Sequence, residues 1–373
     1  MNLTILIIGL GGLGSVLLEL LARSSLSCKL IVGSRNKLNG RACCNLAKLG
    51  AQAQGYDPDI DFIQLDLDEH KETVQTIQSV SPDIIVCTAT RQSWWLPHRL
   101  PAPQASRFKS AGFGLWLPLH LSLPTALMRI LQSAKYRGHT LIAPFPDVVN
   151  CILDRIGLSP TCGIGNVDEI ATKLRGLASA KLGTPIDEVT VTLVGHHALE
   201  KCAFDGSPEA VPYFLKVEQN GRDVTKEIKA VELLTEPFTL PEGPSTHFLT
   251  AGSAVRLITA LGSDRSLRLH APGPNGLPGG YPVLASRSGV TVPEIDGLSL
   301  SDAIRINEQS HKFDGIERIE KDGSVVFTEK VVAVARDELG FNCIPLNPHE
   351  VETRAQELLS KFQAYAKGFG MRF

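Results

Sequence analysis

Three glycines near the start of the chain have the spacing of a loop that binds phosphate groups. Gly9, Gly11 and Gly14 stand in G-x-G-x-x-G order, after the apolar run of residues 3–8 and before residues 15–23, which read as a helix. The first glycine permits a tight turn, the second lets a pyrophosphate approach the backbone, and the third lets helix and strand pack closely. The helix N-terminus adds free N–H groups and the positive end of a dipole. We therefore predict a dinucleotide site with contacts from Gly9, Gly11, Gly12, Leu13 and Gly14.

The residues that follow the second expected strand indicate which dinucleotide binds. NAD-binding units usually carry an acidic residue about 20 residues after the glycine turn, where it binds the ribose 2′-hydroxyl. Here the strand expected over residues 29–33 is followed by Ser34 and Arg35. A hydroxyl and a permanent cation suit a 2′-phosphate, so NADP(H) is favoured over NAD(H). Thr88 and Ala89, at the end of the strand expected over residues 83–88, are predicted to line the same site.

The glycine loop needs a parallel sheet around it, and the first 156 residues alternate between apolar runs and helical patterns. Strands are expected at residues 3–8, 29–33, 61–65, 83–88 and 139–143, and helices at residues 15–23, 41–49, 70–79, 124–136 and 148–156. This alternation is typical of a doubly wound α/β sheet, so residues 1–150 are predicted to form a Rossmann domain. Residues 91–103, rich in Pro, Arg and Trp, are expected to form a loop.

The second half of the chain has a mixed pattern, which predicts an α+β domain over residues 151–373. Long helices are expected at residues 167–182, 246–261 and 348–367. Asn220-Gly221 and Asp322-Gly323 mark two hairpins, and residues 331–335 are expected to continue the second one as a strand.

Composition excludes several classes of function. The formal net charge is -2 and no run of Lys or Arg occurs, so the expected partner is a small molecule and not nucleic acid. No apolar stretch reaches the ~20 residues of a membrane helix, and the N-terminus lacks the pattern of a signal peptide. The eight cysteines show no C-x-x-C spacing, so no metal site is predicted, and free thiols in the cytoplasm are expected.

Two known families resemble parts of this sequence. Residues 1–90 resemble the NADP-binding domain of saccharopine-dehydrogenase-like reductases, through I-I-G-x-G-G-x-G-S and a later G-S-R. Residues 139–290 resemble the lactate/malate dehydrogenase superfamily in five segments taken in order. These are the turn at residues 144–150, Gly165-Asn-Val-Asp168, Val194-Gly-His-His197, Pro244-Ser-Thr246 and the hairpin at residues 280–289. The hairpin after Gly289 is not one that this superfamily leads us to expect.

The dehydrogenase resemblance implies a set of catalytic and substrate-binding residues. It places His197 at the catalytic histidine, Asp168 at its carboxylate partner and Thr246 in the substrate pocket. Arg91 and Arg99 lie where the superfamily keeps arginines that polarise the carbonyl and bind the substrate. Reduction of a ketone by hydride needs a proton donor at the carbonyl oxygen, and histidine is suited to that role. His196, beside His197, remains a rival for it.

Two departures from the superfamily concern the substrate. Ala171 occupies the position of the arginine that clamps a substrate carboxylate, and the asparagine of the N-P-V-D turn is also absent. Trp94 and Trp95 either line a larger, more apolar substrate pocket or pack the loop onto the core. We therefore expect an NADPH-dependent reductase acting on a ketone or imine of a bulkier metabolite.

Two other functions stay open. One is a saccharopine- or opine-type imine reductase, which would require an amine co-substrate. The other is a non-catalytic NADP-binding scaffold or sensor, suggested by the missing arginine. The dehydrogenase resemblance also implies a homodimer or homotetramer, with the helix that begins at Val167 as a candidate interface.

Overall fold

The structure is a computed structural model that describes residues 3–241 and 243–372. Its first layer is a six-stranded sheet in which every neighbouring pair is parallel. The strand order is β3-β2-β1-β4-β5-β6, which is the order of the Rossmann fold and confirms the predicted fold class. The strands are β1 (Leu3–Ile8), β2 (Cys28–Ser34), β3 (Asp59–Gln64), β4 (Ile84–Cys87), β5 (His139–Ile142) and β6 (Cys162–Gly163).

Helices cover both faces of this parallel sheet, as its apolar strands require. Alternate residues of β1 belong to two separate cores: Ile5 and Ile7 face α1 and α2, and Leu6 and Ile8 face α5 and α6. The helices of this layer are α1 (Gly12–Ala22), α2 (Lys37–Gln52), α3 (His70–Val80), α4 (Ala102–Ala111), α5 (Leu117–Ser133) and α6 (Pro146–Arg155), with short 3-10 turns η1 (Leu96–Arg99) and η2 (Phe113–Trp116).

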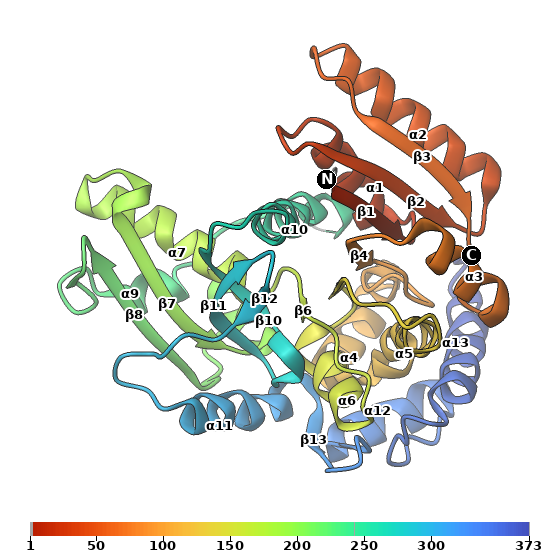
Figure 1. Ribbon diagram of the computed structural model, residues 1–373. Helices are drawn as coiled ribbons and strands as arrows, with labels where there is room; N and C mark the ends of the chain where they lie inside the picture. The colour runs from red at the N-terminus through yellow and green to blue at the C-terminus, as the bar shows by residue number, and fades with distance from the viewer. Residues whose placement is uncertain (1–2, 242, 373) are drawn as a thin grey trace.

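A second, antiparallel sheet follows in the chain and lies beside the parallel one (Figure 1). Its order is β10-β11-β7-β8-β9, with β12 paired to β11. Its strands are β7 (Val189–Gly195), β8 (Tyr213–Gln219), β9 (Arg222–Asp223), β10 (Leu267–Pro272), β11 (Gly280–Ser286) and β12 (Gly289–Thr291). Its helices are α7 (Val167–Leu182), α8 (Glu200–Asp205), α9 (Ala230–Thr235), α10 (His247–Leu261) and α11 (Leu300–Ser310), with 3-10 turns η3 (Ile186–Glu188), η4 (His197–Leu199), η5 (Gly243–Thr246), η6 (Pro274–Gly276) and η7 (His311–Asp314). Helix α10 packs against α1, which joins the two layers.

The C-terminal residues pack against the helices of the parallel sheet. This arrangement differs from the single domain predicted over residues 151–373. The hairpin of β13 (Ile316–Ile319) and β14 (Val325–Phe327), α12 (Glu329–Leu339) and α13 (Val351–Lys367) share one core with α5 and α6. Figure 1 shows α13 beside α5, against which it packs. The apolar face of α13 is therefore buried against the helices of the parallel sheet and not against the antiparallel sheet.

Three sequence-based expectations are wrong in detail. Residues 331–335 are helical, because Val331, Ala335 and Leu339 recur at the spacing of one helix face and Thr328 caps the first turn. The expected loop at residues 91–103 contains η1 and the start of α4. Helix α5 begins at Leu117 and runs through Pro124, because apolar contacts bury it on nearly all sides. Within the described residues no helix is long and apolar enough to cross a membrane.

The return of α13 predicts a strong effect of a single C-terminal substitution. Phe362 is fully buried, with its ring centroid 5.1 Å from Trp116 and 6.3 Å from Phe108. Phe362→Ala should cost about 3–5 kcal/mol of unfolding free energy because it leaves a cavity in the core that α13 shares with α5 and α6. Denaturant unfolding checks this, with Phe369→Ala as the control, because Phe369 is 41% exposed. Equal stability of the two variants would contradict the packing described.

Candidate active site

One large cavity lies where the carboxyl ends of the parallel strands meet α10 and the end of β7. Its volume is about 1570 Å³, larger than the roughly 300–1,000 Å³ of most ligand pockets. In open α/β sheets, ligands bind at the carboxyl ends of the strands, at the point where the strand order reverses. Here that point lies between β1 and β4, and the cavity is lined there by the glycine loop and the residues after β4.

The glycine loop has the conformation that phosphate binding needs. Gly9 has φ +105°, and a Cβ there would lie 2.8 Å from the backbone N of Ala89. Thr88 Oγ1 donates a hydrogen bond to the Gly9 carbonyl at 2.7 Å and so fixes the turn. A Cβ on Gly14 would collide with the same carbonyl, whereas Gly11 faces open space. The loop therefore leaves the backbone of Gly11 free for a phosphate, at the N-terminus of α1.

The predicted cofactor residues mostly border this cavity. Those that line it are Gly9, Gly11, Gly12, Leu13, Ser34, Arg35, Thr88 and Ala89. Gly14 instead packs inside, against Gly9 and Thr88. Arg35 is exposed at the end of β2, and its carbonyl accepts a hydrogen bond from Gln64 Nε2 at 3.3 Å. The shape and donor groups of this end of the cavity fit a dinucleotide.

His197 lines the same cavity on the side of the antiparallel sheet. It follows the end of β7, and its backbone N–H donates to Asp147 Oδ1 at 3.0 Å. Its ring Nδ1 lies 2.8 Å from Asp314 Oδ2, and its Nε2 lies 3.8 Å from Glu200 Oε2. The rings of Phe113 and Phe145 each lie 5.2 Å from the imidazole. One ring nitrogen is thus held by a carboxylate and the other lies near a cavity-lining carboxyl group.

Electrostatics keep this histidine protonated. Burial by itself lowers the pKa of His197, but the charges of Asp314 and Glu200 and the hydrogen bond that the ring donates to Asp314 outweigh it and raise the pKa to about 10. Burial tends to raise the pKa of Asp314, but the charge of His197 and the hydrogen bonds of His196 and His197 hold it well below its usual range. The pair is therefore an imidazolium and a carboxylate at neutral pH. Burial and the His197 charge lower the pKa of neighbouring His120 to about 3, so that ring is neutral.

The structure does not bring Asp168 to His197, which corrects the predicted pairing. Asp168 Oδ1 accepts a hydrogen bond from the backbone N–H of His270 at 3.2 Å, and its Oδ2 lies 3.7 Å from Arg256 Nη1. It sits on the first turn of α7, directed at β10 and α10, and does not line the cavity. The carboxylate partner of His197 is Asp314, which lies 117 residues further along the chain and outside the resembling segments.

His196 differs from His197 in its surroundings. Its side chain is fully buried and does not border the cavity. Its Nδ1 lies 3.2 Å from Asp314 Oδ2 and 3.2 Å from the backbone nitrogen of Ala198. Of the two histidines, only His197 can therefore meet a molecule in the cavity without a rearrangement.

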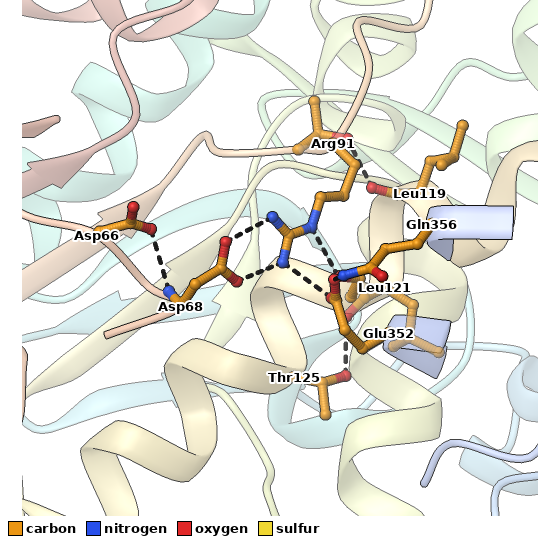
Figure 2. Close-up of polar contacts among 10 residues, drawn as sticks. Asp66, Asp68, Arg91, Leu119, Leu121, Thr125, Glu352 and Gln356 are labelled. Carbon is orange, nitrogen blue, oxygen red and sulfur yellow. Dashed lines mark hydrogen bonds and ion pairs between the residues drawn. The ribbon is translucent and has the colours of Figure 1, made fainter. Parts of the chain in front are cut away.

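Arg91 is engaged by protein carboxylates, which argues against its predicted role at a substrate carbonyl. Figure 2 shows its guanidinium between Asp68 and Glu352. Nη1 donates to Asp68 Oδ2 at 2.8 Å, Nη2 to Glu352 Oε2 at 2.9 Å and Nε to Ser122 Oγ at 3.2 Å. The hydrogen bond with Asp68 raises the pKa of Arg91 further. Arg91 thus ties the residues after β3 to α5 and α13.

The four predicted substrate residues all line the cavity, but each also has a local contact. Trp94 Nε1 donates to His247 Nε2 at 3.3 Å, and the Arg99 guanidinium lies 5.9 Å above the Trp95 ring. Thr246 Oγ1 donates to the Gly243 carbonyl at 2.9 Å. Trp94 and Trp95 therefore contribute aromatic surface to the cavity wall.

Ala171, at the position of the missing arginine, does not line the cavity. Ala171 is buried in the core beneath the antiparallel sheet. Lys173 is also buried, and its ammonium donates to backbone carbonyls, including that of Leu234 at 3.0 Å. Glu169 and Glu200 instead line the cavity near His197, and burial raises the pKa of both carboxyl groups. Sequence reasoning missed these two glutamates because nothing in the local pattern distinguishes them from solvated helix residues.

Comparison with known proteins bears on the fold. No protein-family model and no curated protein matches the sequence. Among solved structures, malate dehydrogenase from Plasmodium falciparum superposes with a TM-score of 0.56 at 13% identity, over 84% of this chain and 98% of that one. A lactate dehydrogenase from a Medee basin deep-sea metagenome library gives 0.55 at 12% identity, over 84% and 96%. Lactate dehydrogenase from Cryptosporidium parvum, complexed with lactic acid and nicotinamide adenine dinucleotide, gives 0.53 at 14%, over 84% and 98%. The chain thus has the fold of lactate and malate dehydrogenases, across both sheets.

The Asp314 contact predicts a measurable change in the titration of His197. Asp314→Asn keeps the shape but removes the charge, so the pKa of His197 should fall from about 10 by about one unit or more. Titration of the His197 ring signals by NMR checks this. Asp168→Asn is the matched control and should leave the His197 titration unchanged. A His197 pKa that follows Asp168 and not Asp314 would contradict the geometry.

Proposed function

We propose that this protein is an NAD(P)H-dependent oxidoreductase that reduces a carbonyl group, with His197 as the proton donor. The observation that carries the proposal is that the His197–Asp314 pair and the glycine loop border one cavity. Structures with the same fold include a malate dehydrogenase in complex with NADH and a lactate dehydrogenase with NADH and oxamate. Their likeness supports the proposal at the level of fold.

The residues of the glycine loop would hold the dinucleotide. The backbone of Gly11 and the N-terminus of α1 suit the pyrophosphate, and Ser34 and Arg35 suit a 2′-phosphate. When bound, the reduced nicotinamide supplies a hydride. His197, as imidazolium, would protonate the carbonyl oxygen of the substrate. Asp314 would hold the ring in place through Nδ1 and stabilise its charge, as the aspartate of a serine-protease triad does.

The cavity supports a substrate larger than a short 2-oxo acid. Ala171 removes the arginine fork that would bind a carboxylate in two places. The wall beside His197 carries Glu169 and Glu200 instead, and the aromatic rings of Trp94 and Phe113 line other parts of the cavity. We therefore propose a bulky, partly apolar ketone that does not depend on a carboxylate next to the reacting carbon.

The two glutamates also favour a second candidate, the imine reductase. A positively charged iminium group would lower the raised pKa of a nearby glutamate and be stabilised by the carboxylate that forms. In that case turnover would require an amine co-substrate together with the carbonyl compound, which discriminates it from ketone reduction. A non-catalytic NADP-binding protein would instead bind NADPH but would not oxidise it, either with carbonyl compounds alone or with carbonyl compounds plus an amine.

The cofactor preference can be tested at Arg35. NADPH should bind at least about ten-fold more tightly than NADH, because a charged hydrogen bond to phosphate contributes about 1.5–3 kcal/mol. Arg35→Asp should abolish or reverse this preference in a fluorescence titration. Arg41→Asp changes an exposed arginine on α2 that does not line the cavity and should leave the preference intact. Equal affinities of the wild type for both dinucleotides would rule out NADP selectivity.

The role of His197 can be tested by substitution and by pH. His197→Ala should lower kcat by about 10²–10⁴ with little change in NADPH affinity. Because the acid is the protonated ring, ketone reduction should be constant near neutral pH and fall as pH rises through about 10. Oxidation of the alcohol needs the neutral ring and should rise over the same range.

A variant of Asp314 tests whether the pH dependence of ketone reduction reflects the His197–Asp314 ion pair. Asp314→Asn should move the alkaline limb of the reduction profile to lower pH. Adding Asp314→Asn to His197→Ala should lower kcat little further, because Asp314 acts through the His197 ring. Full activity of His197→Ala on a verified substrate would refute the proposed proton donor.

A further inference from the structure

His247, the first residue of α10, lies against the glycine loop. Its side chain lines the cavity but is only 8% exposed. A Cβ placed on Gly12 would lie 2.7 Å from both Cε1 and Nδ1 of this imidazole. Gly12 is the glycine that the G-x-G-x-x-G pattern does not require. The close approach of His247 therefore gives a physical reason for a glycine at that position.

Trp94 determines which nitrogen of His247 carries the proton. Indole Nε1–H can only donate, and it lies 3.3 Å from His247 Nε2, which must accept. Burial lowers the pKa of His247, so the ring is neutral at neutral pH. A neutral imidazole whose Nε2 accepts carries its hydrogen on Nδ1.

That Nδ1–H is a buried donor without a use inside the protein. Among the described residues it has no hydrogen-bond partner. Buried polar groups in native structures are nearly always paired, so an unpaired donor beside a cavity indicates an acceptor that binds there. The donor lies at the first turn of α1, where dinucleotide-binding folds hold the pyrophosphate.

We propose that His247 Nδ1–H donates a hydrogen bond to the pyrophosphate of the bound dinucleotide, and that Trp94 positions it by fixing the tautomer. This rests on the proposed dinucleotide-dependent function. It adds a phosphate ligand from α10 directly beside the glycine loop. The cofactor would thereby contact both α1 and α10. Trp94, in the segment after β4, would affect cofactor affinity by fixing the tautomer of His247.

The test is His247→Phe, which keeps the ring and removes the donor. Three probes are titrated calorimetrically: NADPH, 2′-phosphoadenosine 5′-diphosphate, and 2′-phosphoadenosine, which has no 5′-phosphate. The variant should weaken binding of the first two by roughly ten-fold or more, as expected for a hydrogen bond to a charged group. Binding of the third should be unchanged, which also shows that the adenosine end is intact.

The outcomes separate this inference from the function on which it rests. Wild-type protein that binds none of the probes would refute dinucleotide binding and the inference together. Wild-type binding of NADPH with no loss in His247→Phe would overturn the inference alone. Loss for NADPH without loss for the diphosphate would place the contact on the nicotinamide riboside and also overturn it.

The positioning role of Trp94 has its own readout. Nitrogen-15 chemical shifts of the His247 ring should report the Nδ1–H tautomer in the wild type and in Trp95→Phe, which does not alter the Trp94 bond. Trp94→Phe should give a mixture of tautomers and an intermediate loss of diphosphate affinity. An unchanged tautomer in Trp94→Phe would show that another group fixes the ring.

Discussion

The buried carboxylate of Asp314 is the contact on which the geometry of the candidate site depends. It is 1% exposed and lies within 3.2 Å of the Nδ1 atoms of both His196 and His197. A carboxylate this far from water is stable only beside a positive charge, and His197 supplies that charge. The protonated state of the proposed catalytic ring is therefore a consequence of folding, and it is present before any substrate binds.

Asp314 can reach that position only because three distant segments converge. A Cβ on Gly112 or Gly114 would lie 2.6 Å from the backbone of Asp314, so the chain after α4 must be free of side chains there. The β13–β14 hairpin and α12 then continue into the core that α13 completes with α5. Asp147, at the start of α6, binds the backbone N–H of His197 from the parallel sheet side. The histidine is thus fixed by groups from both layers, which suits its proposed role as a proton donor.

The parts of this account that were predictable from sequence depend on short stretches of chain. Gly9, Gly11 and Gly14, the strand before them and the helix after them all belong to one β-α unit. The sequence of that unit alone therefore indicates the loop. The partner of His197 was not predictable in that way. Asp168 stands in the sequence motif that implies the pairing, but its carboxylate accepts a hydrogen bond from the His270 backbone N–H. Asp314 comes from a segment 117 residues beyond His197. The carboxylate contacts of Arg91, which lines the cavity, were likewise not predictable, because Glu352 lies 261 residues away. Preference for NADP, the homo-oligomer and the cytoplasmic location stay predictions.

A crystal structure with NADPH bound would show whether the dinucleotide and the His197–Asp314 pair serve one reacting centre. We expect the pyrophosphate to lie on the glycine loop. The nicotinamide C4 should face His197 Nε2 across a gap that one carbonyl group fills, so that the reacting atoms would lie about 3–3.5 Å apart. A nicotinamide ring outside the cavity, or one separated from His197 by protein atoms, would contradict it.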